Sequence, residues 1–408
     1  MKCRHCDSVI KNTFLDLGFA PPSNAYLDSD HLSCHEVHYP LKVNVCEDCW
    51  LVQTEDYNDA DELFTEEYAY FSSTSNSFVE HAKKYSQEVI KRFNLSSQSF
   101  VMEIASNDGY LLRNFVESSI PCIGVEPTKS TAEASRKLNI EVIEEFFGEV
   151  TANKIVNSYQ QADLIIGNNV YAHVPDINDF TLGMKASLKS NGVITLEFPH
   201  LLNLIKYNQF DTVYHEHFSY LSLQSVNAIF ESAGLKVFDV EKLDTHGGSL
   251  RVYGCHEQDS RLISDSVLNL LSEENINQLN MTKTYKNFQS KAESVKNNFL
   301  EFLLMQKKKK KKVIAYGAAA KGNTLLNFAG IKTDLIQYVV DAAEAKQNKF
   351  MPGSHIPIVS PENLNRIEFD YIVILPWNLS NEIYNILKDR VKKGTQFVTA
   401  IPELKIFS

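Results

Sequence analysis

The sequence predicts an α/β protein with two sheet-containing units behind a small metal-binding module. Three observations lead to this prediction. Short apolar runs alternate with amphipathic segments between residues 63 and 256, as in a doubly wound sheet. The alternation returns in the last third of the chain, and two Cys-x-x-Cys pairs stand within the first 50 residues. We therefore expect a zinc module at 1–62, a doubly wound unit at 63–256 and a second α/β unit at 257–408.

Composition narrows the class of protein. The chain has 408 residues, of which 44% are apolar, and this is enough for two or three globular domains. Its net charge of −11 argues against a nucleic-acid backbone as partner. No apolar run reaches the roughly 18 residues that a membrane helix needs, and the start, MKCRHCD, has no hydrophobic signal region. We expect no membrane contact and a cytoplasmic location, where thiols stay reduced.

The first module is predicted from its cysteines. Two Cys-x-x-Cys turns bring four thiolates to one ion, which is typical of a closed, structural zinc site. Four reduced, unligated cysteines are the alternative. The long spacer between the pairs also holds PPSNAYL and HLSCHEVH, which leaves other ligands open. The expected ligands are Cys3, Cys6, Cys46 and Cys49, and the open alternatives are Cys34, His31, His35 and His38.

The central unit reads as strands alternating with helices. An amphipathic helix over 78–93 precedes it, and the rhythm that follows predicts a parallel sheet covered on both faces. Ligands of such sheets bind at the carboxyl ends of the strands. The predicted strands are 100–105, 120–126, 162–168, 192–198 and 235–241, and the predicted helices are 110–117, 128–138, 176–189 and 222–233.

The predicted strand ends carry polar and small residues that suit a nucleoside cofactor. The first strand runs into a small-residue turn, 105–109, that lets a ligand approach the backbone. Glu126 ends the second, where an acid can bind ribose hydroxyls. Asn168, Asn169 and His173 follow the third. Each turn alone could serve backbone geometry only. Because no GxGxxG turn is present, S-adenosylmethionine fits better than NAD.

The segment YHEHFSY, 214–220, concentrates groups that suit proton abstraction next to a carbonyl. A histidine can act as the base, a glutamate can orient it, and a tyrosine can donate to the enolate oxygen. On a regular strand, Tyr214 and Glu216 would share one face and His217 the other, so we predict a loop. An edge strand facing solvent and a metal pair formed by His215 and His217 are the alternatives.

The last third begins with a polar helical stretch, 259–310, that ends in a lysine run and continues into four predicted strands. The first strand opens into GAAAKGN, where exposed amides and Lys321 could hold a phosphate. Tight strand–helix packing would also explain its small residues. Upstream, Arg251 of HGGSLR could pair with a diphosphate or form a structural ion pair. The predicted strands are 312–317, 335–341, 369–376 and 395–401.

Together these motifs resemble the bacterial sugar C-methyltransferases, which use S-adenosylmethionine and act on nucleotide-linked 4-keto-deoxyhexoses. The resemblance extends over almost the whole chain. It implies a zinc domain, a central class I methyltransferase domain and a C-terminal Rossmann-like α/β domain, with substrate between the last two. The matching pieces are the paired Cys-x-x-Cys, EEYAYFSSTSNSF (66–78), EIASNDGYLL (103–112), GVEPT (124–128), NNVYAHVPD (168–176), FDTVYHEHFSY (210–220), HGGSLRVY (246–253) and YGAAAKGNTLLN (316–327).

The resemblance also implies roles for individual residues. His217 matches the base, with Tyr214 and Glu216 as catalytic partners, and Tyr68 and His173 match two further active-site positions. The implied cofactor residues are Glu103, Ala105, Ser106, Asn107, Gly109, Tyr110, Glu126, Pro127, Asn168 and Asn169. The implied substrate residues are His246, Arg251, Lys321 and Asn323.

The predicted activity is therefore C-methylation beside the keto group of a nucleotide-linked sugar. The resemblance favours dTDP as the nucleotide and C3 as the carbon. An NAD-dependent sugar-nucleotide enzyme and a zinc-stabilised binding protein with a vestigial cofactor fold are the alternatives. The sequence leaves open the sugar, the stereochemistry of the product and the oligomeric state.

Overall fold

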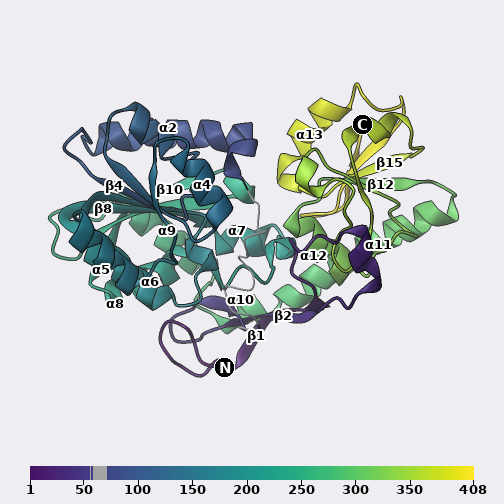
Figure 1. Cartoon of the computed structure of the whole chain (residues 1–408). Helices are drawn as coiled ribbons and strands as arrows, with labels where there is room; N and C mark the ends of the chain where they lie inside the picture. The colour runs from purple at the N-terminus through teal and green to yellow at the C-terminus, as the bar shows by residue number, and fades with distance from the viewer. Residues whose placement is uncertain (56, 58–70) are drawn as a thin grey trace.

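The computed structural model describes residues 1–55, 57 and 71–408, which form three sheets (Figure 1). The first sheet is antiparallel and belongs mainly to the cysteine-rich N-terminal module. Its fourth strand comes from the YHEHFSY motif and pairs with the third, so the module is built directly onto the predicted catalytic segment. The strands are, in spatial order, β1 (Asn12–Ala20), β2 (Tyr39–Val45), β3 (Val52–Thr54) and β9 (Ser219–Tyr220).

The central sheet has seven strands and the arrangement of class I methyltransferase folds. Five neighbouring strands are parallel, and four of them are at predicted positions; the fifth, the edge strand 141–143, was not predicted. The strand predicted at 235–241 extends to residue 243 and is antiparallel to its neighbour, because an additional strand, 249–256, lies between it and the parallel set. The spatial order is β10 (Leu235–Leu243), β11 (Ser249–His256), β8 (Leu188–Pro199), β7 (Ala162–Asn168), β4 (Val101–Ile104), β5 (Cys122–Val125) and β6 (Glu141–Ile143).

Helices cover both faces of the central sheet, each over its own hydrophobic core (Figure 1). One core includes Tyr85 and Phe115, and the other includes Phe180 and Phe230. The first face carries α2 (Asn76–Arg92), α3 (Arg113–Glu117) and α4 (Lys129–Arg136). The second carries α5 (Glu149–Ser158), α6 (Ile177–Ser187), α8 (Leu223–Ser232) and α9 (Asp265–Ile276).

The C-terminal sheet has six strands, five of them parallel. The predicted strand positions hold, and a short strand is added at each edge. The order is β14 (Ile358–Val359), β13 (Val339–Val340), β12 (Val313–Tyr316), β15 (Tyr371–Ile374), β16 (Gln396–Thr399) and β17 (Lys405–Phe407). The helices of this part are α10 (Thr282–Lys286), α11 (Phe288–Lys308), α12 (Ala320–Phe328) and α13 (Ser380–Leu387).

The polar stretch after residue 259 is helical, as predicted, and joins the three sheets. Its first helix, α9, packs on β10 of the central sheet, whereas α11 packs on β1 of the N-terminal module. The last helix ends at Lys308, inside the lysine run. Because these helices pack on more than one sheet, the division of the chain at residues 62 and 256 stays a prediction. None of the described helices is both long and apolar enough to cross a membrane.

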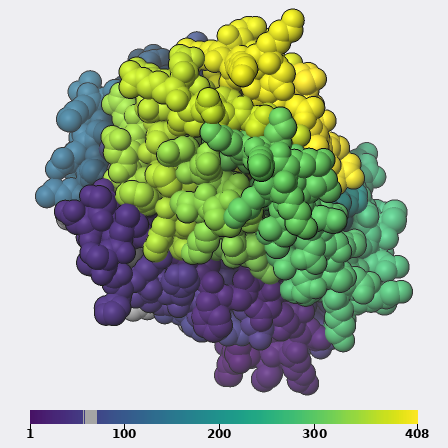
Figure 2. Space-filling model, turned by 90° about the vertical axis from the view of Figure 1, so that its right-hand side faces the viewer, coloured from purple at the N-terminus to yellow at the C-terminus, as the bar shows by residue number. Residues whose placement is uncertain are grey.

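Short 3₁₀ turns place several of the polar side chains discussed below. The N-terminal module also reaches the C-terminal unit: Figure 2 shows its purple residues lying against the green and yellow part of the chain. Leu27 and Phe350 pair there in an antiparallel bridge. The turns used below are η3 (Tyr171–His173), η4 (Phe210–Thr212), η5 (Thr245–Gly247) and η8 (Trp377–Leu379). The remaining turns are η1 (Ser29–Ser33), η2 (Ser72–Thr74), η6 (Glu344–Lys346) and η7 (Pro361–Asn365). One further helix, α7 (Leu201–Lys206), follows β8.

Candidate active site and zinc centre

The four predicted metal ligands form one cluster. The sulfur atoms of Cys3, Cys6, Cys46 and Cys49 all lie within 4.8 Å of one another. Gln53 donates a hydrogen bond of 3.2 Å to the sulfur of Cys3, which orients that ligand. A set of four converging sulfurs suits tetrahedral zinc. Cys34 is exposed and lies outside the cluster, as do the three alternative histidines among the described residues.

The turn after β4 has the backbone shape of a ligand cradle. Ala105, Asn107 and Gly109 all have a positive φ, at 56°, 51° and 78°. A Cβ at Gly109 would lie 2.6 Å from Ile140, so only glycine fits there. Glu126, at the end of β5, accepts the backbone N–H of Asn107 at 2.9 Å and thereby fixes the turn. The predicted turn and its acidic partner are therefore in direct contact.

Buried polar atoms line this edge of the sheet, where β4, β5 and β7 end. Glu103 is 1% exposed, and burial raises the pKa of its carboxyl well above the ordinary value. Oε2 of Glu103, Oγ of Ser106 and Oδ1 of Asn168 have no hydrogen-bond partner among the described residues. Asn169 holds a φ of 54° and donates its N–H to the carbonyl of Glu197.

These orphaned atoms fit a bound group rich in donors, as the ribose hydroxyls and amino groups of S-adenosylmethionine are. The other predicted cofactor residues flank the same edge. Tyr110 is buried in the core beside the turn, and Pro127 follows Glu126 in the chain.

The YHEHFSY segment forms a buried loop, as predicted, and only its last two residues are in a strand. The loop turns because the N–H of His217 donates to the carbonyl of Tyr214 at 3.0 Å. This turn brings the two ring centroids to 4.0 Å with the planes tilted by 38°, and the ring centroid of His173 lies 4.5 Å from that of His217 in an edge-on contact. Three predicted catalytic residues therefore converge, and the solvent-facing edge strand is excluded.

The tautomer of His217 follows from its hydrogen bond. Its Nδ1 lies 3.0 Å from the carbonyl oxygen of Thr212, in η4. A carbonyl can only accept, so Nδ1 carries the proton and Nε2 holds the lone pair. We expected Glu216 to orient this ring; the backbone does so instead. Glu216 faces the N-terminal module, where Asn24 donates to both of its oxygens at 3.1 and 2.9 Å.

Burial controls the charge of this cluster. It lowers the pKa of His217 well below the ordinary value, and the neighbouring His173 adds to the effect. It lowers the pKa of His173 to about 4 and that of His246 to about 4. Burial raises the pKa of Glu216 to about 7, against the hydrogen bond from Asn24. The imidazoles are neutral at pH 7 and able to accept a proton.

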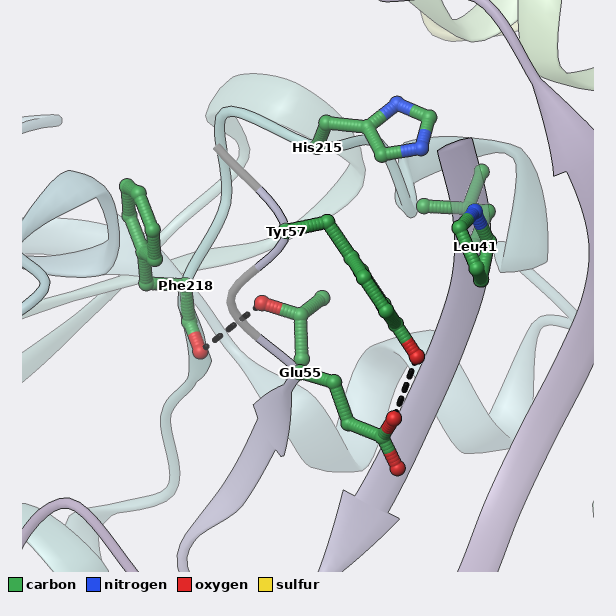
Figure 3. A pocket seen from close by; sticks show the side chains of 7 residues that line it. Leu41, Glu55, Tyr57, His215 and Phe218 are labelled. Atoms are coloured by element: carbon green, nitrogen blue, oxygen red, sulfur yellow. Dashed lines mark hydrogen bonds between the residues drawn. The ribbon is translucent and has the colours of Figure 1, made fainter. Parts of the chain in front are cut away.

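His215 points away from these groups. Figure 3 shows it beside Leu41, Glu55 and Tyr57, lining a small hollow between the loop and the N-terminal module. Its Nε2 lies 3.3 Å from the carbonyl of Tyr39. Among the described residues, only the four cysteines form a group of three or more potential metal ligands, and neither His215 nor His217 belongs to such a group.

The C-terminal unit closes the other side of the site. Lys321, at the start of α12, donates to Asn378 at 2.8 Å and lies 4.9 Å above the ring of Trp377. Trp377 in turn donates to the buried carboxyl of Asp211, in η4, at 2.8 Å. Burial raises the pKa of Asp211 to about 7, and Lys321 opposes this effect. Lys321 also acts electrostatically on His217 and His246, so it belongs to the cluster.

Two of the predicted substrate residues have structural partners. Arg251 is 3% exposed and lies 2.6 Å from Glu197, with Glu241 as a second partner, so the structural ion pair is the correct alternative. Asn323 donates to the carbonyl of Ser23 at 2.6 Å and so joins two parts of the chain. Its buried Oδ1 has no partner among the described residues. Tyr68 lies outside the described residues.

Three residues of this region carry no predicted role. Asp211 lies inside FDTVYHEHFSY, one of the motifs quoted above, so a signal was present. Asn24 lies in PPSNAYL, between the metal ligands, where nothing local indicates a contact some 190 positions away. Trp377 follows a predicted strand and has no motif of its own.

Comparison with known proteins places the chain among its relatives. It is 33% identical to the C-methyltransferase NovU of Streptomyces niveus over 407 residues, which span 100% of this chain and 97% of that protein. The chain belongs to the C-methyltransferase family. Three domain families match in order: a zinc-binding domain at 3–64, a methyltransferase domain at 78–240 and a C-methyltransferase C-terminal domain at 244–402. S-adenosylmethionine and zinc are accordingly the cofactors of this C-methyltransferase.

Solved methyltransferase structures cover a little under half of this C-methyltransferase, at low sequence identity. A S-adenosylmethionine-dependent methyltransferase of Anabaena variabilis is 15% identical, with a TM-score of 0.38, and covers 49% of this chain and 96% of its own. One from Clostridium acetobutylicum is 10% identical, with a TM-score of 0.35, and covers 44% of this chain and 92% of its own.

Proposed function

We propose that this C-methyltransferase adds a methyl group to C3 of a dTDP-linked 4-keto-6-deoxy sugar, after base-catalysed formation of an enolate. One observation carries the proposal: a neutral, buried imidazole with a fixed lone pair stands between the cofactor edge and the C-terminal unit. His217 Nδ1 is committed to the carbonyl of Thr212, so Nε2 is the atom that removes the proton.

The surroundings of His217 support this role. Burial lowers the pKa of the ring, so the unprotonated form dominates at neutral pH. The phenol of Tyr214, whose ring centroid lies 4.0 Å from that of His217, can donate to the enolate oxygen that becomes negative as the proton leaves. His173, whose ring centroid lies 4.5 Å from that of His217, can orient the sugar hydroxyls, and Glu216 belongs to the same loop as the base. S-adenosylmethionine, when bound, supplies an electrophilic methyl group.

The nucleotide side of the substrate is assigned to α12. Lys321 is the cation at this helix start, and both its partner Asn378 and the ring of Trp377 keep the ammonium turned toward η4. A diphosphate between Lys321 and the first amides of α12 would combine a fixed charge with a helix N-terminus. The predicted contacts of Arg251 with diphosphate are not part of this proposal, because its guanidinium is held by Glu197.

An NAD-dependent enzyme using the C-terminal unit is less well supported. Asp341, which would bind ribose in such an enzyme, instead accepts the N–H of Ala318 at 2.6 Å. The carbonyl of Ala318 in turn accepts hydrogen bonds from Tyr26 and Lys346. The turn after β12 is thus occupied by contacts within the protein.

The direct test is a product assay. The zinc-loaded protein is incubated with a dTDP-linked 4-keto-6-deoxyhexose and S-adenosylmethionine carrying a ¹³C-methyl group, and the product is analysed by NMR. We expect the label on C3, and a rate about 10²–10⁴-fold lower for His217→Asn. S-adenosylhomocysteine should raise the melting temperature and NAD should not. A methyl group on oxygen, or no transfer to any keto sugar nucleotide, would contradict the proposal.

A further inference from the structure

The segment between β1 and β2 connects the zinc module to both other units. We name residues 21–36 the N-terminal strap. It lies along the C-terminal unit, where Leu27 pairs with Phe350 and Glu36 accepts the N–H of Gly353 at 2.7 Å. At its start, Tyr26 donates to the carbonyl of Ala318 at 2.5 Å. These contacts at both ends fix the path of the strap past the catalytic loop.

Asn24 is the strap residue that reaches the catalytic loop. Its side-chain nitrogen donates to Oε1 of Glu216 at 3.1 Å and to Oε2 at 2.9 Å. Glu216 is 3% exposed, and its carboxylate accepts no other hydrogen bond from the described residues. One amide from another part of the chain therefore sets the plane of this carboxylate.

We infer that Asn24 is a positioning residue for methyl transfer, which fixes the orientation of the Glu216 carboxyl group in the loop that carries the base. This inference rests on the proposed function. A zinc module that only stabilised the fold would have no reason to direct a lone amide at an active-site carboxylate. The strap gives the module a part in the chemistry, although its metal site is closed and structural.

The other titratable groups around Glu216 cannot replace Asn24. They are the phenols of Tyr26 on the strap and Tyr220 on β9, and the imidazoles of His173 on η3 and His217 on the loop itself. Burial raises the pKa of both phenols and lowers that of both imidazoles, so all four are neutral at pH 7. The amide of Asn24 is what opposes the effect of burial on the pKa of Glu216.

Asn24→Asp tests this role with little change in shape. The variant replaces the donor by a second carboxylate, which disfavours ionisation of Glu216. We expect the pKa of Glu216 to rise by about one unit or more, and the acid limb of the kcat/KM profile to move to higher pH with it. The pKa is read by infrared titration of protein labelled with ¹³C-glutamate, with Glu216→Gln identifying the band.

Two further variants separate positioning from folding. Asn24→Ala removes the donor without adding a charge, so the pKa of Glu216 should rise by less than in Asn24→Asp. His355→Gln removes the imidazole that contacts Glu36 of the strap at 2.9 Å and leaves Asn24 in place. It should loosen the strap without moving the titration of Glu216.

The titration needs no substrate, so it is independent of the product assay. Absence of methyl transfer to any keto sugar would overturn the proposed function and leave the contact between Asn24 and Glu216 standing. The positioning role is overturned if Glu216 titrates in Asn24→Asp and Asn24→Ala as in the wild type. It is equally overturned if His355→Gln moves the titration as far as Asn24→Asp does.

Discussion

Burial decides the protonation state of the histidines around the catalytic loop. His217, His173 and His246 all have a lowered pKa, because an imidazolium would lose its hydration there. Arg251 in β11 is also buried but keeps its charge, because Glu197 and Glu241 neutralise it. The first arrangement suits proton abstraction, and the second suits a permanent structural role.

The lowered pKa of His246 makes stability depend on pH. Between pH 6.5 and about 4 the unfolded chain binds a proton at this residue and the folded protein does not, so stability falls as the pH falls through this range. His246→Asn keeps a side chain suited to the φ of 55°. Between pH 7 and pH 4.5 the free energy of unfolding, measured with urea, should therefore fall by about 1–3 kcal/mol less in the variant than in the wild type. Parallel pH profiles for the two proteins would contradict this prediction.

Residue chemistry was predictable where a group acts inside its own motif. His217 and Tyr214 meet because they lie on one tight turn, and a loop was predicted there because a regular strand would place the two side chains on opposite faces. The partner of Glu216 was not predictable, since Asn24 is brought to it by the path of the strap. The role of Arg251 was left open between two partners, and local sequence cannot choose between a ligand and an ion pair.

At the scale of elements, one buried carboxylate joins three helices to the end of β8. Glu274 in α9 is fully buried and lies 2.7 Å from His200, which leads into α7. It also accepts the first two N–H groups of α8, from Leu223 and Gln224, at 2.7 and 2.9 Å. Those donors have no partner within their own helix, so Glu274 caps α8 from a distance.

Neighbouring glutamates in α9 provide a matched test. Glu274→Ala leaves an imidazole and two amides unpaired in the interior, and we expect a loss of about 3–5 kcal/mol in the free energy of unfolding. Glu273→Ala removes a partly exposed carboxylate that pairs with Lys206 and Lys242, and should cost about 1 kcal/mol or less. Chemical denaturation measures both values. Equal losses for the two variants would show that Glu274 is not the junction described.

Elements with strong periodic patterns were predictable and elements defined by pairing were not. The parallel strands β4, β5 and β7 are apolar runs that need burial on both faces. The strand β11 begins inside HGGSLRVY, which was interpreted as a site motif because of its polar residues, so its strand pattern was not predicted. The strand β9 has two residues, and only its partner β3 makes it a strand.

At the scale of the whole molecule, the site depends on all three parts of the chain. One hydrophobic core joins β1 and β2 of the zinc module to α7, α11 and the C-terminal sheet. Trp377 reaches across from the C-terminal unit to Asp211, and a Cβ at Gly247 would lie 2.5 Å from its ring. The glycine of η5 therefore lets the two units approach closely. These contacts fix the C-terminal unit against the part of the chain that carries the catalytic loop proposed above.

The central claim is that His217 removes the proton beside the carbonyl. The most direct measurement places the protein in deuterated water with the keto sugar nucleotide and without a methyl donor, and follows the C3 proton by NMR. The account predicts that wild type replaces this proton with deuterium and that His217→Asn, folded and loaded with zinc, does not. Exchange in His217→Asn at the wild-type rate would show that another group is the base.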